Sequence, residues 1–340
     1  MTWKPFNPGD KWGQPWGSGW VRGQVELDPS FFGKEVFLQF DCGAVETLVQ
    51  INGEYQGLFN NVVSEEGTRS NHHTLRIAKK GVASQRLEIL MQIYAGHPCK
   101  GTQPNEDRER AGAAKYVKRF KQCGLCLKDE KIEKFAFDLR TVRLLSMSTS
   151  DVFVQGLAYD ILGKVFEAVD QHPARLSPEE RYRQIDAVQP SMDRLIYEQQ
   201  PSSLAPVAHI IGHSHMDTAW LWTSEETVRK CARTFSMALN MMERYPDYKF
   251  IQSSSIHTEM MRTEFPSIFE GMKKRIAEGR WEPNGGMYVE ADCNLPSGES
   301  LVRQFLKGQN YNQKHFNYRS DTFWLPDTFG YNAALPQIMN

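Results

Sequence analysis

Alternating polar and apolar positions mark the first part of the chain as β structure. Strands rich in β-branched and aromatic residues are expected at Glu35–Phe40, Glu46–Ile51, Arg86–Tyr94 and Lys134–Leu139. The Asn52-Gly53 dipeptide is typical of a two-residue hairpin turn. Residues 1–20 hold four tryptophans among Gly and Pro, which favours an extended segment. These signals predict a β-sandwich over about residues 20–145, within an accessory domain at residues 1–145.

A helical pattern follows. Apolar residues recur at helical spacing from Asp151 to Ala168, and Ser177-Pro178-Glu179-Glu180 has the N-cap, N1 proline and first-turn acids of a helix start. The pattern breaks at Gln199–Pro206. We therefore assign residues 146–206 to a helical connector and linker. The strongly charged stretch Asn105–Lys121 is interpreted as a solvated loop or an exposed helix.

Strand and helix signals alternate after Pro206. Strands are expected at Val207–Gly212, Lys249–Ser253, Trp281–Val289 and Thr322–Leu325, and helices at Ser224–Arg244, Thr258–Gly279, Ser297–Phe316 and from Ala333 onward. The pattern predicts a parallel sheet or barrel of four β/α units in a domain at residues 207–340. In such folds the catalytic groups lie at the carboxyl ends of the strands. The overall class is thus multidomain β plus α/β.

Composition narrows the functional classes. Hydrophobic residues make up 40% and charged residues 24% of the chain, and the net charge is −1, so no global field attracts nucleic acid. No run of 18 apolar residues is present, which argues against membrane insertion. Without an apolar leader or an N-x-[ST] acceptor, we expect an intracellular protein of the cytoplasm or a vacuole. The Cys123-x-x-Cys126 pair has no second pair at zinc-ribbon spacing, and we interpret it as incidental reduced thiols.

The first candidate site follows the apolar run that begins at Val207. His213, His215 and Asp217 stand at i, i+2 and i+4, so in an extended chain their side chains point to one side. Two imidazoles and a carboxylate at a strand end are suitable ligands for a divalent metal. The alternative is a pair of core or capping histidines beside a surface aspartate.

The second candidate is Asp327, directly after the fourth expected strand. Pro326 and Gly330 restrict the turn that carries it, so the carboxylate is expected to face the same cavity as Asp217. A carboxylate beside a metal and among aromatic rings suits glycoside hydrolysis. Trp220, Phe329 and Tyr331 offer such rings. The alternatives are a helix-capping aspartate and aromatic residues that merely fill a core.

Three long motifs make these hypotheses specific. The sequences GHSHMDTAWLW (212–222), GGMYVEADCNLPSGE (285–299) and WLPDTFGY (324–331) resemble the retaining α-mannosidases of glycoside hydrolase family 38. The resemblance is strongest to the cytosolic and vacuolar branch of that family. It implies that the domain at residues 207–340 forms the first four β/α units of a (β/α)7-type barrel.

The resemblance also implies roles for individual residues. His215 and Asp217 correspond to zinc ligands, and Asp327 to a residue that is both a zinc ligand and the catalytic nucleophile. Trp220 corresponds to the aromatic residue beneath the mannose ring and Phe329 to a neighbouring wall. The position of His213 is not usually a ligand in the family, so we expect this residue to support the ligands without binding the metal.

Two parts of the family's site lie downstream of Asn340. These are the fourth zinc ligand, a histidine, and the aspartate that acts as general acid/base. Glu290 and Asp292 are the carboxylates of this chain that could substitute for the acid. The expected function is retaining, metal-dependent hydrolysis of terminal non-reducing α-D-mannose residues in oligosaccharides, with only part of the active site in this chain.

Two other functions remain open. One is a catalytically incomplete fragment or a mannose-binding module without hydrolase activity. The other is a metal-dependent amidohydrolase, which needs further metal-binding histidines on later strands; His257 and His315 fit that pattern poorly. The expected partner is a mannose-containing oligosaccharide, and the sequence leaves room for a homo-oligomer of the complete enzyme.

Overall fold

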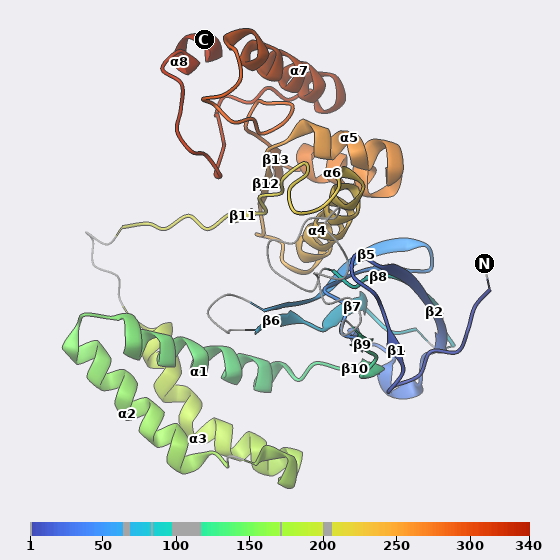
Figure 1. The fold of residues 1–340 in the computed structure, drawn as a ribbon. Coiled ribbons are helices and arrows are strands. Elements are labelled where there is room, and N and C mark those ends of the chain that lie inside the picture. Colours follow the sequence, from blue (N-terminus) through green and yellow to red (C-terminus); the bar gives the residue numbers. More distant parts are fainter. Residues whose placement is uncertain (1, 64–68, 83, 97–116, 171, 200–205) are drawn as a thin grey trace. The chain divides into compact units, whose positions relative to one another are not determined.

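The computed structural model describes the chain except residues 1, 64–68, 83, 97–116, 171 and 200–205 (Figure 1). It forms two compact units. One unit combines Met1–Cys126 with Ile210–Asn340, and the other is Leu127–His209. Most of the charged stretch Asn105–Lys121 and most of the linker Gln199–Pro206 lie outside the described residues.

The N-terminal part of the first unit consists of antiparallel sheets. The strands are β1 (Lys11–Trp12), β2 (Ser18–Glu26), β3 (Val36–Asp41), β4 (Glu46–Ile51), β5 (Glu54–Val63), β6 (Arg69–His72), β7 (Thr74–Ala78), β8 (Arg86–Tyr94), β9 (Lys118–Arg119) and β10 (Gln122–Cys126), with a short 3-10 turn at Pro29–Phe31. They pair in the orders β2-β8-β4-β5-β6, β10-β3-β7 and β1-β9. Cys123 and Cys126 lie on β10, opposite Phe40 and Phe37 of β3.

The hairpin expected at Asn52-Gly53 is confirmed. Ile51 of β4 pairs with Glu54 of β5, so two residues form the turn. Asn52 and Gly53 have φ values of 52° and 83°. Positive φ at both central residues is the geometry of a type I′ turn, whose twist matches that of the flanking strands.

One hydrophobic core joins the two larger sheets. The alternating residues Leu87, Ile89, Met91 and Ile93 of β8 are buried on one face of the strand. They belong to the same cluster as residues of β3 and β7 in the three-stranded sheet, which are Val36, Leu38, Phe40, Leu75 and Ile77. The polar and apolar alternation of β8 in the sequence therefore corresponds to its exposed and buried faces, whereas β3 is buried on both faces.

The second unit is helical. It contains α1 (Glu130–Ser148), α2 (Val152–Ala168) and α3 (Pro178–Ile196), with a 3-10 turn at Pro173–Arg175. The expected start of α3 is confirmed as a capping box between Ser177 and Glu180. The strand expected at Lys134–Leu139 is wrong, because this segment lies inside α1. Phe135, Leu139 and Val142, which recur at helical spacing, pack against the other two helices. The helical part thus begins at Glu130, ahead of the expected connector.

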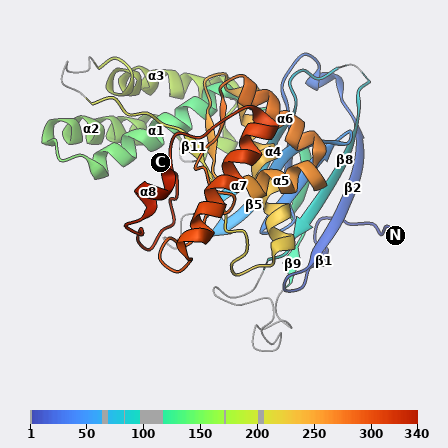
Figure 2. The ribbon, with the colours of Figure 1, turned by 90° about the horizontal axis from the view of Figure 1, so that it is seen from above.

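The C-terminal part of the first unit alternates parallel strands with helices. Its elements are β11 (Gly212–His213), α4 (Ser224–Arg244), β12 (Phe250–Gln252), α5 (Ser255–Glu264), α6 (Pro266–Ala277), β13 (Trp281–Pro283), α7 (Gly298–Phe316) and α8 (Leu335–Met339). The strands form one parallel sheet in the order β11-β12-β13. Figure 1 shows α4, α5 and α6 beside this short sheet, and Figure 2 shows these helices with α7 from above. In the described residues no helix is long and apolar enough to cross a membrane.

Four predicted elements of the C-terminal part differ from the structure. The strand expected at Trp281–Val289 ends at Pro283. The strand expected at Val207–Gly212 is reduced to Gly212–His213, and Val207 and Ile210 are 79% and 93% exposed because β12 pairs only with the last residues of the run. The helix expected at Thr258–Gly279 is two helices, since the ring of Pro266 cannot continue the first one.

The strand expected at Thr322–Leu325 is also wrong. The structure assigns it no regular element. The carbonyl oxygens of Thr322 and Leu325 accept hydrogen bonds from the hydroxyl groups of Ser320 and Tyr331, at 2.8 and 3.2 Å. Side chains therefore satisfy backbone groups that a neighbouring strand would otherwise have bound.

Helix α4 connects the two parts of the first unit. Arg233 of α4 is 1% exposed and forms ion pairs with Glu46 of β4 and Glu226 of α4 itself. Nζ of Lys230 lies 2.9 Å from Oε1 of Glu46. A buried carboxylate is stable only when it is paired in this way, so the charges fix α4 on the sheet.

Candidate metal centre

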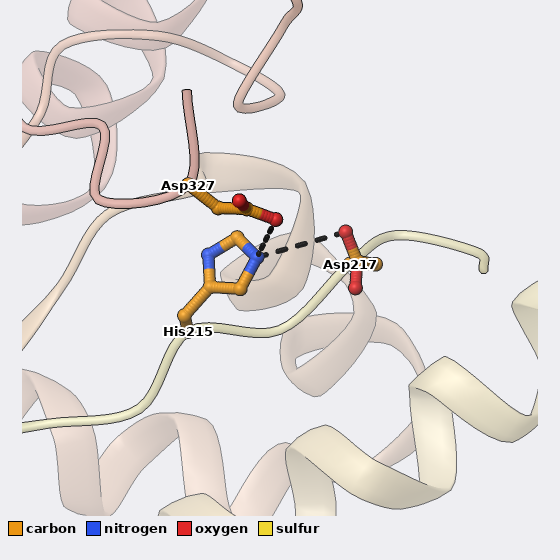
Figure 3. A group of neighbouring side chains, drawn as sticks. All are labelled: His215, Asp217 and Asp327. Atoms are coloured by element: carbon orange, nitrogen blue, oxygen red, sulfur yellow. Dashed lines mark ion pairs between the residues drawn. The ribbon is translucent and has the colours of Figure 1, made fainter. Parts of the chain in front are cut away.

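His215, Asp217 and Asp327 converge in the structure (Figure 3). One potential ligand atom from each of them lies within 4.8 Å of the others. Nε2 of His215 is 3.6 Å from Oδ1 of Asp217 and 3.5 Å from Oδ2 of Asp327. The tertiary structure thus brings together the three residues that the sequence suggested as metal ligands.

A hydroxyl group of α4 anchors the segment that carries Asp217. Thr227 is fully buried, and its Oγ1 donates to the carbonyl oxygen of Thr218 at 2.7 Å. Oγ1 of Thr227 also accepts a hydrogen bond from Nε1 of Trp222 at 2.9 Å. Thr223 caps the first turn of α4. These contacts hold the chain directly after His215 against the start of a long helix.

The loop that carries Asp327 is tied to β11. Nε1 of Trp324 donates to Nε2 of His213 at 3.2 Å, and the two rings meet edge to face at 5.5 Å. Burial, and then the neighbouring His215, lower the pKa of His213, so its ring is a neutral acceptor. His213 therefore contacts the loop that carries Asp327. This contact supports the site from outside the three candidate ligands.

Glu290 lies on the other side of His215. Its Oε2 is 2.8 Å from Nδ1 of His215, within ion-pair distance but outside the geometry of a hydrogen bond, and its side chain is 8% exposed. The hydroxyl of Ser253 donates to Oε1, and the backbone N–H of Glu290 donates to Oγ of Ser254 at 3.1 Å. Burial raises the pKa of Glu290, while Ser253 and His215 act in the opposite direction.

The donor set fits a divalent cation. Two atoms bound tetrahedrally to one Zn²⁺ at about 2.1 Å are about 3.4 Å apart, close to the separations around His215. Nε2 of His215 is buried and has no hydrogen-bond partner among the described residues. An imidazole nitrogen without a partner, facing two carboxylates, is the environment expected of a metal ligand.

The two aromatic residues assigned to the substrate are exposed. Trp220 is 59% exposed and meets Trp222 edge to face at 5.6 Å, and Phe329 is 82% exposed. Within the described part of the chain no ring contact joins Trp220 to Phe329. Their exposure leaves both rings accessible to a ligand.

Both Glu290 and Asp292 contact other groups of the protein, so neither carboxylate is free to act as the acid. Glu290 is held by Ser253 and His215, and Oδ1 of Asp292 accepts the backbone N–H groups of Asn294 and Leu295 at 2.7 and 2.9 Å. The sequence named Glu290 as a carboxylate that could act as the acid but did not reveal its contact with His215. It gave no signal for Ser253, whose position depends on tertiary packing.

His257, weighed above as a metal-binding histidine of an amidohydrolase, lies next to Thr218. It is buried on α5, and its Nε2 lies 3.3 Å from Oγ1 of Thr218. Burial, and then His215, lower the pKa of His257 to about 4. Because His257 is not among the converging ligand atoms, the amidohydrolase alternative receives no support from the described residues.

Comparison with known proteins agrees with the motifs. Residues 205–340 match the glycosyl hydrolases family 38 N-terminal domain. Alpha-mannosidase 2C1 of Mus musculus is 32% identical over 351 aligned residues, covering 100% of this chain and 31% of that protein.

Two further relatives align with a shorter part of the chain. Alpha-mannosidase G of Dictyostelium discoideum is 46% identical over 38% of this chain and 12% of its own length. The alpha-mannosidase of Saccharomyces cerevisiae is 42% identical over 42% of this chain and 13% of its own. The chain spans about a third of the length of the relative that it matches throughout. It belongs to glycosyl hydrolase family 38 and is a homologue of the alpha-mannosidases of that family.

Proposed function

We propose that this chain contributes the metal-binding and nucleophilic part of a retaining α-mannosidase that removes terminal α-D-mannose residues from oligosaccharides. The observation that carries the proposal is the convergence of His215, Asp217 and Asp327, from two segments far apart in the sequence. In this proposal residues 207–340 supply the first β/α units of a (β/α)7-type barrel. An intracellular location, in the cytoplasm or a vacuole, belongs to the same proposal.

The three converging side chains would hold one divalent cation, and zinc suits a nitrogen and two carboxylate oxygens best. When bound, the ion supplies a Lewis-acidic anchor for neighbouring hydroxyl groups of the sugar. Trp220 and Phe329 are proposed to contact the mannose ring, because exposed aromatic faces stack on the apolar faces of sugars.

Asp327 is the proposed nucleophile. Its side chain is about half exposed, unlike that of Glu290, so it is accessible to a substrate. In a retaining mechanism its carboxylate attacks the anomeric carbon and forms a glycosyl ester, which water then hydrolyses. A second carboxyl group about 5–5.5 Å away must protonate the leaving oxygen. We do not assign this group to Glu290 or Asp292, because contacts with the protein occupy both.

The short part of its relatives that this chain covers favours a second candidate function, binding without hydrolysis. Since the chain aligns with 31% of the mouse protein, a second possibility is that the 340 residues bind metal and mannose without hydrolysing a glycosidic bond. Binding without turnover uses the same side chains, so the two functions differ only in the acid/base group.

Trapping of the glycosyl ester tests the proposal. The chain, and the longer protein if the reading frame continues, are incubated with a fluorinated α-mannosyl fluoride that slows hydrolysis of the ester. We expect peptide mass spectrometry to find the sugar on Asp327, and Asp327→Asn to abolish labelling. Asp321→Asn, a neighbouring exposed aspartate, is the control. Label on another carboxylate refutes the assignment, whereas mannose binding without any label in either protein favours the binding module.

A further inference from the structure

Contacts with the protein restrain the side chain and the backbone of Glu290. Its side chain is nearly buried, Ser253 donates to one carboxylate oxygen, and Nδ1 of His215 lies 2.8 Å from the other. Its backbone is fixed by Ser254. The loop preceding it is tightly packed, since Gly286 and Met287 lie directly against Gly308 of α7. The position of this carboxylate is therefore determined by two strand ends and a helix.

His215 has two ring nitrogens in different surroundings. Nε2 faces Asp217 and Asp327, and Nδ1 lies on the far side of the ring (Figure 3). A neutral imidazole carries one proton, and only the nitrogen without it can donate a lone pair to a cation. A carboxylate next to Nδ1 favours the proton there and leaves Nε2 free to bind.

We infer that Glu290 is a positioning residue, which keeps the proton of His215 on Nδ1 and turns Nε2 toward Asp217 and Asp327. Ser253 in turn orients Glu290, so that a serine, a glutamate and a histidine form a chain from β12 to the metal centre. This inference rests on the proposed metal site. It assigns Glu290 a task other than proton transfer to a substrate.

The tautomer of His215 provides a test that requires neither metal nor turnover. The protein is labelled with ¹⁵N-histidine, freed of metal with a chelator and studied by NMR about two pH units above the ordinary histidine pKa. The signals of His215 are assigned by comparison with His215→Gln. We expect the Nδ1–H form in the wild type and a large loss of it in Glu290→Ala. Glu290→Gln keeps the size of the side chain and is expected to show a smaller change in the same direction, because an amide oxygen is a weaker acceptor.

Titration with Zn²⁺ alone provides a second readout. Loss of the partner of a metal-bound histidine typically weakens binding about 10- to 100-fold, and we expect a weakening in that range for Glu290→Ala. Glu290→Asp keeps the charge but shortens the side chain, so it should also weaken binding if position matters. Glu299→Gln, an exposed glutamate at the start of α7, is the control.

Some outcomes would overturn the inference. One is a wild-type His215 that carries its proton on Nε2. Another is a Glu290→Gln or Glu290→Ala variant that folds and still has the tautomer of the wild type. Circular dichroism establishes which of the two variants folds. The measurement on the metal-free protein also separates the two proposals. Loss of the tautomer preference with no mannoside chemistry would support Glu290 as a positioning residue and refute only the proposed function.

Discussion

Nε1 of Trp324 lies 3.2 Å from Nε2 of His213, and this contact joins the two segments that supply the candidate metal ligands. Asp327 follows Trp324 by three residues, and His215 follows His213 by two. No strand pairing links the two segments in the described residues, so side chains fix their separation.

Removal of this indole donor should therefore weaken metal binding. In Trp324→Phe an aromatic ring remains but the indole N–H is lost, and the loop of Asp327 gains freedom relative to His215. We expect about a 10-fold weaker affinity for Zn²⁺, measured by competition with a chromophoric chelator, since outer contacts of ligands typically contribute at least this much. Trp3→Phe, on the N-terminal segment, serves as the control. An equal affinity for both variants would show that the contact does not position Asp327.

Arg233 should be among the most sensitive positions for stability. Its replacement by Ala leaves Glu46 paired only with Lys230 and Glu226 only with Arg229. Removal of one partner from a buried ion pair typically costs about 3–5 kcal/mol. We expect a loss in this range from the free energy of unfolding, measured with urea and tryptophan fluorescence.

The exposed pair Lys273–Glu270 offers a matched comparison, because solvent already screens its charges. Lys273→Ala should change the free energy of unfolding by less than about 1 kcal/mol. Similar losses for the two variants would mean that Arg233 does not act through burial of its partners.

Gly308 is expected to tolerate no side chain. A Cβ at this position would meet the carbonyl oxygen of Gly286 at 2.3 Å and the carbonyl carbon of Met287 at 2.5 Å. Because these are backbone atoms of the segment that leads to Glu290, Gly308→Ala must displace α7 or that segment. Overpacking of this kind typically costs about 1–3 kcal/mol, and we also expect weaker Zn²⁺ binding. Gly298→Ala, at the open start of the same helix, is the control and should leave both quantities nearly unchanged.

His257 should make the stability of the metal-free chain depend on pH. Burial lowers its pKa to about 4 in the folded state, below the ordinary value of about 6.5. Between these two pH values the unfolded chain binds more protons, so stability is highest above pH 6.5 and falls as the pH decreases toward 4. The contribution should decline by at most about 1.4 kcal/mol per pH unit.

The matched variant is His257→Gln, which cannot be protonated in this range. Its free energy of unfolding, measured by urea titration at several pH values, should decline less steeply between pH 6.5 and 4 than that of the wild type. Parallel curves for the two proteins would rule out His257 as the source of the slope.

Local patterns predicted those parts of the fold that depend on neighbouring residues. The hairpin at Asn52-Gly53 and the capping box at Ser177 were correct because a few adjacent side chains fix the backbone in such motifs. Alternation in β8 predicted its buried face for the same reason. The apolar segment Lys134–Leu139 was assigned wrongly because alternation over six residues is also compatible with one stripe of a helix.

The candidate site likewise combines features that the local sequence determines with features that only tertiary packing determines. The spacing of His215 and Asp217 and the motif around Asp327 are local features, so the sequence alone determined which residues are candidate ligands and to which family the chain is similar. Only the tertiary structure decided that the three side chains meet, that His213 contacts Trp324 and that Glu290 lies against Nδ1 of His215. Such contacts join residues from separate strands, loops and helices, and they depend on how those elements pack rather than on the order of residues within any one of them.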